Sequence, residues 1–155
     1  MSSSVSINVL YVDDEVYNLT AFRAGFRRDF NIFTAESAAE GLKILRTEDI
    51  HVIVTDQRMP VTTGIEFLES IIPEFPEPIR ILLTGYADIN AVIDAINKGH
   101  VYKYIQKPWS DTDLKMNIEK AFEIYTLRKE NRELTERLII SNKQLEYLLR
   151  QNPPS

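Results

Sequence analysis

Apolar residues fall into five short runs along the chain, and between the runs they recur with the spacing of an amphipathic helix. The intervening stretches predict helices over 16–28, from Ser37 onward, near 65–72 and over 88–99. Ser37 with Glu40 has the S-x-x-E pattern of a helix start, and Gly99 is a typical helix-ending residue. Continuous apolar strands alternating with helices indicate an α/β fold with a five-stranded, doubly wound parallel sheet covered on both faces. The five runs are INVLYV (7–12), NIFTA (31–35), HVIVTD (51–56), IRILLT (79–84) and VYKYIQ (101–106).

From Ser110 onward the pattern changes to that of one long helix of about 40 residues, because no strand pattern or strong breaker precedes Pro153. Seven positions step alternately by four and three, which predicts a coiled-coil seam. They are Leu127, Asn131, Leu134, Leu138, Ser141, Leu145 and Leu148. Asn131 would be a polar seam residue, a feature that favours one register and a homodimer. A solvated charged helix with chance leucines is the alternative. The expected organisation is a globular domain over 1–125, a coiled-coil helix over 126–152 and a disordered tail over 153–155.

The composition narrows the class of protein. With 155 residues, 44% hydrophobic and 26% charged, the chain resembles ordinary globular proteins. Its net charge of −5 argues against direct nucleic-acid binding. It has no cysteine, which excludes disulfides and fits a reducing compartment. The N-terminus has no signal-peptide pattern, and no run approaches the roughly 18 apolar residues of a membrane span, so we expect a cytoplasmic protein without membrane insertion.

Chemically distinctive residues follow the predicted strands at their carboxyl ends. Asp13 and Asp14 end the first strand, Asp56 ends the third, Thr84 the fourth, and Lys107 follows the fifth. In an open parallel sheet, ligands bind at this edge. Carboxylates there would form a hard oxygen site suited to Mg²⁺, and a lysine with a hydroxyl suits the oxygens of a phosphoryl group. A carboxylate can also be a nucleophile that forms an aspartyl phosphate.

Each of these residues also has an ordinary structural explanation. Asp13 suits the N-cap of the first helix, and Asp56 could be a loop acid. Thr84 could lie at the edge of the core, as could Tyr104, and Lys107 could be a solvated charge. We interpret Glu15 as a first-turn helix acid or a group behind the metal ligands, and the two histidines, His51 and His100, as structural.

Four segments, in order, carry a resemblance to a known family. They are YVDDE, VTDQRMPVTTG, LLTGYAD and YIQKPW, and over about residues 5–125 the chain resembles the receiver domain of two-component response regulators. The resemblance implies a flavodoxin-like sheet of strand order 2-1-3-4-5. It also implies a signalling function rather than that of a free-standing enzyme. The receiver would catalyse its own aspartyl phosphorylation and dephosphorylation, with a sensor histidine kinase or a phosphotransfer protein as its partner.

The resemblance also assigns roles by position. Asp56 would be the phosphoacceptor, Asp14 a direct Mg²⁺ ligand, Asp13 a ligand acting through water, and the backbone carbonyl of Arg58 a further ligand. In turn, Thr84 and Lys107 would contact the phosphoryl oxygens. Gly85 would leave room for the phosphoryl group, and Lys107-Pro108 would be a cis peptide. Thr84 and Tyr104 would form a switch that reshapes the face of the fourth helix, fifth strand and fifth helix.

Two further positions, Arg58 and Tyr86, lie two residues after Asp56 and Thr84, where such receivers vary. A long cation and a ring there predict slow autodephosphorylation. Aspartyl-phosphate hydrolases resemble D-x-D-x-T, but Arg58 occupies the place of their second acid, which disfavours that alternative. A degenerate receiver used only for binding is a third hypothesis. No output-domain pattern follows the receiver, so the chain is either complete or a fragment of a longer regulator.

Overall fold

The computed structural model describes residues 6–85, 87 and 89–152. Within them, one sheet of five parallel strands has the order β2-β1-β3-β4-β5, which confirms the predicted fold class and strand order. The strands are β1 (Asn8–Val12), β2 (Asn31–Ala35), β3 (Val52–Asp56), β4 (Ile79–Thr84) and β5 (Lys103–Gln106). The helices are α1 (Val16–Phe26), α2 (Ala38–Thr47), α3 (Gly64–Ile71), α4 (Ile89–Asn97) and α5 (Asp111–Gln151).

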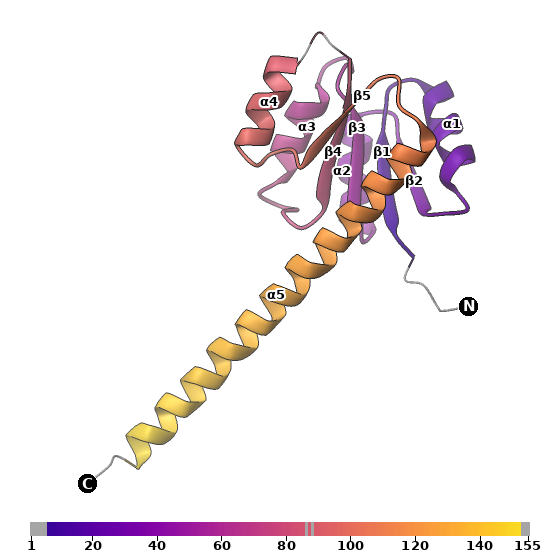
Figure 1. Ribbon diagram of the computed structural model, residues 1–155. Helices are drawn as coiled ribbons and strands as arrows, with labels where there is room; N and C mark the ends of the chain where they lie inside the picture. Colours follow the sequence, from indigo (N-terminus) through magenta and orange to yellow (C-terminus); the bar gives the residue numbers. More distant parts are fainter. Residues whose placement is uncertain (1–5, 86, 88, 153–155) are drawn as a thin grey trace. The chain divides into compact units, whose positions relative to one another are not determined.

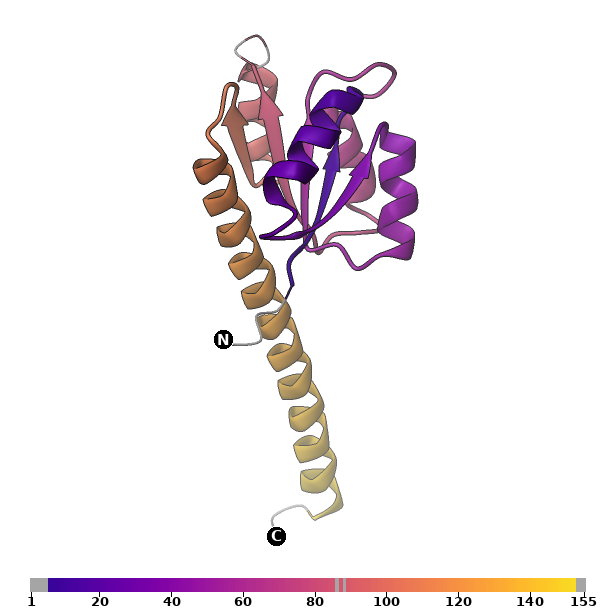
Figure 2. The same ribbon diagram turned by 90° about the vertical axis from the view of Figure 1, so that its right-hand side faces the viewer.

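The sheet separates two hydrophobic cores because successive strand side chains point to opposite faces. Val9 and Tyr11 belong to the core that α1 and the first turns of α5 cover, which we call the α1–α5 core. Leu10 and Val12 belong to the core under α2, α3 and α4, which we call the α2–α4 core. Figure 1 shows α3 and α4 on one side of the sheet and α1 on the other, and in Figure 2 α1 crosses in front of the strands.

The ends of the helices follow local chemistry. Ser37 caps α2 as predicted, since its hydroxyl accepts a hydrogen bond from the backbone N–H of Glu40 at 3.2 Å. A complete capping box starts α3, in which Thr63 and Glu66 exchange hydrogen bonds, and it was not among the predicted features. Gly99 follows α4 with φ of 78°, the left-handed conformation that ends helices. Asp88, the predicted first residue of this helix, lies outside the described residues.

Several element boundaries differ from the prediction by one or two residues. Strand β1 begins at Asn8 rather than at residue 7, β3 begins at Val52 rather than at residue 51, and α4 ends at Asn97, two residues before Gly99.

Helix α1 ends at Phe26 rather than at residue 28, and the chain then forms a turn in which the backbone N–H groups of Asp29 and Phe30 both donate to the carbonyl of Phe26. Strand β5 begins at Lys103 rather than at residue 101, because the backbone N–H of Val101 is directed to the carbonyl of Ala95 in α4. In both places, backbone N–H groups just beyond a helix bond back to its last turn before the chain enters the next strand.

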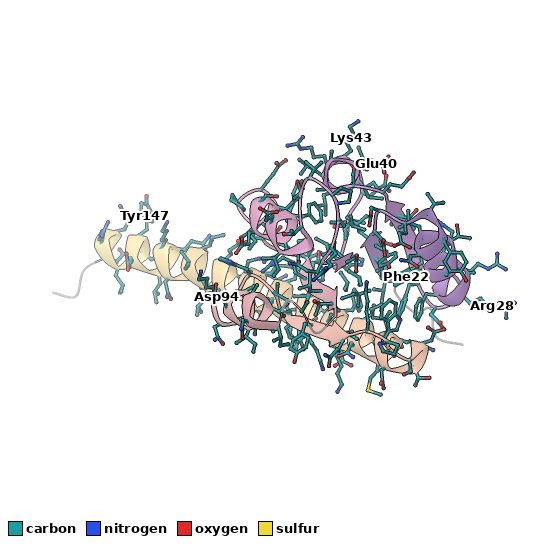
Figure 3. The ribbon with its side chains drawn as sticks, turned by 90° about the horizontal axis from the view of Figure 1, so that it is seen from above. Phe22, Arg28, Glu40, Lys43, Asp94 and Tyr147 are labelled. Atoms are coloured by element: carbon teal, nitrogen blue, oxygen red, sulfur yellow. The ribbon has the colours of Figure 1, made fainter. Side chains whose placement is uncertain are left out.

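Helix α5 is 41 residues long and belongs to two compact units, of which one ends at Tyr125 and the other begins at Thr126. In the first unit, Leu114, Ile118 and Ala121 are buried in the α1–α5 core. In the second unit the apolar side chains are exposed, among them Tyr147, which projects from the last turns of the helix (Figure 3). Among the described residues, no helix has both the length and the apolar character needed to cross a bilayer.

Candidate functional site

Three carboxylates meet at the carboxyl edge of the sheet. Strands β1 and β3 are neighbours, with Val12 opposite Thr55. The next residue on each chain segment, Asp13 just after β1 and Asp56 at the end of β3, therefore comes side by side with the other. Asp14 completes the group, and one carboxylate oxygen of each acid lies within 4.8 Å of the others. Asp13 and Asp56 are buried, with 1% and 6% of their surface exposed, whereas Asp14 is exposed. Mg²⁺ prefers hard oxygen ligands such as these carboxylates. A bound cation would also offset the repulsion between their closely spaced negative charges.

The carboxylate of Asp13 is held by three donors. Its Oδ2 accepts hydrogen bonds from the Tyr11 hydroxyl at 2.7 Å and from the Asn18 amide at 3.1 Å, and its Oδ1 accepts one from the backbone N–H of Glu15 at 3.0 Å. Burial and the hydrogen bond to Asp13 raise the pKa of Tyr11 well above its usual range. The N-cap residue of α1 is Glu15, not Asp13, although the Asp13 side chain does serve one of the free backbone donors there.

Asp56 forms an ion pair with the ammonium group of Lys107, which extends from the loop after β5. Burial raises the pKa of the Asp56 carboxyl, the nearby lysine opposes that effect, and the charges of Asp13 and Asp14 add to it. Lys107 reaches this position because its backbone N–H donates to the carbonyl of Thr84 at 2.9 Å, which continues the pairing of β5 with β4. Asp56 is thus a buried carboxylate that has two other acids close by and one cation paired with it. A carboxylate whose pKa is perturbed in this way is a candidate for a reacting group.

The loop after β3 is packed closely against Asp56. A Cβ atom at Gly64 would collide with the backbone carbonyl of Asp56 and would approach the Leu82 side chain to 2.8 Å, so only glycine fits there. The backbone N–H of Gly64 donates to the carbonyl of Gln57, and the buried Gln57 side chain accepts from the N–H of Ile65, both at 2.9 Å. These contacts anchor the start of α3 beside β3.

Known proteins identify the group to which this arrangement belongs. The family model of the response regulator receiver domain matches residues 9–119. The chain belongs to this family. It is 35% identical over 127 residues to the hydrogenase transcriptional regulatory protein HoxA of Bradyrhizobium diazoefficiens, a match that covers 82% of this chain and 26% of the relative. The HoxA of Cupriavidus necator is 36% identical over 126 residues, which cover 81% of this chain and 26% of the relative. The chain thus spans about a quarter of the length of these regulators.

Solved structures agree with this family. A response regulator receiver domain protein from Clostridium thermocellum superposes with a TM-score of 0.74 at 30% identity, covering 78% of this chain and 98% of that one. The crystal structure described as adenylate cyclase from Rhodopirellula baltica superposes with a TM-score of 0.82 at 29% identity, covering 85% and 98%.

The receiver also positions the remaining predicted residues. Thr84 is buried at the end of β4, and its hydroxyl donates to the carbonyl of Gly85 at 3.2 Å. A Cβ at Gly85 would meet nothing within 4 Å, so the space beside it is open. Tyr104 is half-buried against the α2–α4 core. Arg58 is exposed on the loop after β3, and Tyr86 lies outside the described residues. The bond between Lys107 and Pro108 is cis, as the resemblance implied.

The other titratable residues considered from the sequence have structural partners. His51 accepts a hydrogen bond from the backbone N–H of Asn8 at 3.0 Å, and its ring packs against Phe122 and Tyr125. His100 contacts Glu69 at 2.7 Å. Glu15 is exposed at the start of α1.

Several residues of the site were not identified from the sequence. Tyr11 and Asn18 were missed, although period-two alternation along β1 puts Tyr11 on the same face as Asp13. Asn18 is the helical residue one turn beyond Glu15. The roles of Gln57 and Gly64 depend on the approach of α3 to β3, which no local pattern encodes.

Proposed function

We propose that this receiver accepts a phosphoryl group on Asp56 from the phosphohistidine of a sensor histidine kinase or a phosphotransfer protein. The observation that carries the proposal is the buried Asp56 carboxylate, which lies close to the two acids that follow β1 and forms an ion pair with the ammonium group of Lys107. Membership of the receiver family supports the same function.

The reaction is a transfer between two side chains. A carboxylate oxygen of Asp56 attacks phosphorus, and the bond between phosphorus and the imidazole nitrogen of the donor breaks as an acyl phosphate forms. The electron pair of the broken bond stays on that nitrogen, and the ring, which carries a proton on its other nitrogen, leaves as neutral imidazole. Asp13, Asp14, Asp56 and the backbone carbonyl of Arg58 would hold Mg²⁺. When bound, the ion supplies positive charge for the phosphoryl oxygens. Lys107, which pairs with Asp56 before the reaction, would then bind a phosphoryl oxygen. The Thr84 hydroxyl, which donates to the carbonyl of Gly85, would turn to donate to another phosphoryl oxygen.

The same two contacts would start the conformational switch. Movement of Thr84 towards the phosphoryl group frees space at the end of β4, and the half-buried ring of Tyr104 on the neighbouring strand would follow inwards. The surface formed by α4, β5 and the first turns of α5 would change shape as a result. A charge change at one side chain thus biases a two-state element.

The second unit of the chain would pair with a second copy as a coiled coil. Its seam leucines stay 56–63% exposed in the single chain, and they recur at the spacing of a two-stranded coiled coil, with Asn131 as the polar seam residue. The seam leucines are Leu127, Leu134, Leu138, Leu145 and Leu148. Phosphorylation would alter the packing of the dimer and so move this helix. Disulfide crosslinking of cysteines placed at seam positions, with and without a phosphoryl mimic, tests this step, and identical patterns would count against it.

Arg58 and Tyr86 would lengthen the lifetime of the aspartyl phosphate by shielding it from water. We expect Arg58→Ala and Tyr86→Ala to lose phosphate faster than the wild type. Unchanged or slower loss in both variants would contradict this role.

The test of the main proposal is the intact mass of the protein after incubation with Mg²⁺ and acetyl phosphate. We expect one phosphoryl adduct in the wild type and in Asp49→Asn, a control at an exposed acid, and none in Asp56→Asn. An adduct that persists in Asp56→Asn would place the acceptor elsewhere. A folded wild type that takes up no phosphoryl group from acetyl phosphate or from a phosphorylated histidine donor would favour a binding module over a working receiver.

A further inference from the structure

The most densely hydrogen-bonded group at the site is Asp13 rather than the acceptor. It is 1% exposed, so its carboxylate has lost almost all contact with water and must be satisfied by the protein. Three donors do this, and they come from three places: the strand (Tyr11), the backbone at the start of α1 (Glu15) and the first turn of α1 (Asn18). An ionised carboxylate offers about four acceptor positions, so about one remains for a metal ion or its bound water.

Two of the three donors converge on the same oxygen. The Tyr11 hydroxyl and the Asn18 amide both donate to Oδ2, at 2.7 and 3.1 Å, whereas the backbone N–H of Glu15 takes Oδ1. This arrangement restricts rotation of the carboxylate about its own axis. Hydrogen bonds from protein groups to a metal ligand orient it before the ion arrives, and losing such a bond commonly weakens metal binding.

Tyr11 is itself held in place. Its ring stacks on Phe22 with centroids 4.1 Å apart and an interplanar angle of 10°, and the residue is 1% exposed within the α1–α5 core. Asn18 is fixed in α1 by the hydrogen bond from its backbone N–H to the carbonyl of Glu15 at 3.0 Å. Neither donor can move far without disturbing the core or the helix.

We infer that Tyr11 and Asn18 are positioning residues for the magnesium site, and that they clamp one oxygen of Asp13 so that its carboxylate is preset for the ion. This inference rests on the proposed function, because it concerns the ion that the phosphoryl transfer requires. Neither residue touches the reacting atoms. They act through Asp13, and their effect is on the affinity for Mg²⁺ rather than on the transfer step.

The test is the affinity of the full chain for Mg²⁺ alone, measured by titration calorimetry. Tyr11→Phe removes the hydroxyl and keeps the ring that stacks on Phe22, so we expect the fold to persist and the dissociation constant to rise by about ten-fold or more. Asn18→Ala should have an effect in the same direction. Tyr17→Phe is the matched control, since Tyr17 is 80% exposed, and it should bind Mg²⁺ like the wild type.

Two further measurements separate positioning from a general structural effect. In phosphorylation by acetyl phosphate, Tyr11→Phe should need about ten-fold more Mg²⁺ for half-maximal rate but reach the wild-type rate at saturation. In an Asp13→Ala background, adding Tyr11→Phe should change Mg²⁺ affinity less than two-fold, because the residue through which it acts is gone.

The outcomes distinguish this inference from the proposed function. Wild-type Mg²⁺ affinity in Tyr11→Phe, or a ten-fold loss that persists in the Asp13→Ala background, overturns the clamp and leaves the phosphoacceptor proposal standing. A wild type that binds no Mg²⁺ overturns the clamp and the proposed metal site together. Loss of Mg²⁺ affinity only where Asp13 is present supports the clamp.

Discussion

The predicted seam of the C-terminal helix, whose leucines are exposed in the single chain, leads to a quantitative prediction about dimerisation. Leu138 lies in the middle of the seam and is 63% exposed in the single chain. Full burial of a leucine side chain contributes about 1.5–3 kcal/mol, so burying the exposed part in a dimer contributes roughly 1–2 kcal/mol per chain. Truncation to alanine removes most of this, about 1–1.5 kcal/mol per chain and about 2–3 kcal/mol per dimer. Leu138→Ala should therefore raise the dimer dissociation constant roughly 30- to 150-fold.

Ile140 provides a closely matched control. It is 57% exposed and lies two residues along the same helix, but it falls outside the predicted seam. Ile140→Ala should leave the dissociation constant within about two-fold of the wild type, because no partner side chain covers that position in a two-stranded coiled coil. Alanine is also the better helix former, so the control does not weaken the helix itself.

Sedimentation equilibrium of the full chain over a wide concentration range measures all three dissociation constants. A wild type that stays monomeric throughout would refute the seam, as would equal weakening by both substitutions. Equal weakening would mean that the helix associates through a broad apolar surface rather than through the heptad positions.

Three further predictions concern the first unit. Burial raises the pKa of Asp56 in the folded state, so the ionised carboxylate lowers the free energy of unfolding. The metal-free protein should therefore become more stable as the pH falls from neutral through that pKa. Asp56→Asn should raise the urea midpoint at pH 7 and abolish much of this pH dependence. A lower midpoint for Asp56→Asn would contradict this. Gly64→Ala should destabilise the fold by about 1–3 kcal/mol in thermal unfolding. Gly25→Ala in α1, whose Cβ would meet only the Asp111 side chain at an ordinary 3.7 Å, should be neutral or stabilising. A tolerated Gly64→Ala would mean that the loop after β3 relaxes easily. Since Lys107 lowers the pKa of Asp56, Lys107→Ala should shift the acidic limb of phosphorylation by acetyl phosphate to higher pH, and an unmoved limb would show that the pair does not control ionisation.

Local chemistry accounts for what the sequence predicted well. Strand and helix positions follow from hydrophobic period, the start of α2 from Ser37, and the end of α4 from Gly99, since each depends on residues within one or two turns. The strand order came from the resemblance to the receiver family, because hydrophobic runs alone do not rank strands within a sheet. Once the order was assumed, the meeting of Asp13 with Asp56 followed, because β1 and β3 are then neighbours.

What was missed depends on contacts between distant segments or on a signal that was present but not used. The close approach of Gly64 to the carbonyl of Asp56 depends on how α3 packs on β3. The backbone N–H of Val101 is directed to the carbonyl of Ala95 in α4, and β5 therefore starts later than predicted. The sequence does not show whether this donor bonds to the helix or to the neighbouring strand. The pairing of Tyr11 with Asp13 was accessible from alternation along β1, but a tyrosine in an apolar run is ordinarily taken as core.

Strand β5 lies at the edge of the sheet and contributes side chains to both hydrophobic cores. The sheet separates the two cores. Tyr104 packs against the α2–α4 core, whereas its neighbour Ile105 belongs to the α1–α5 core together with Leu114 and Ile118 of α5. In the proposed switch, a displacement of Tyr104 would therefore reach α5 by moving the backbone of β5 rather than through a shared set of side chains. That backbone pairs with a neighbour on one side only, over four residues of β4, so a shift of β5 would disturb the pairing with one strand rather than with two. The edge strand β5 would thus be the element through which a change on one face of the sheet reaches the other face.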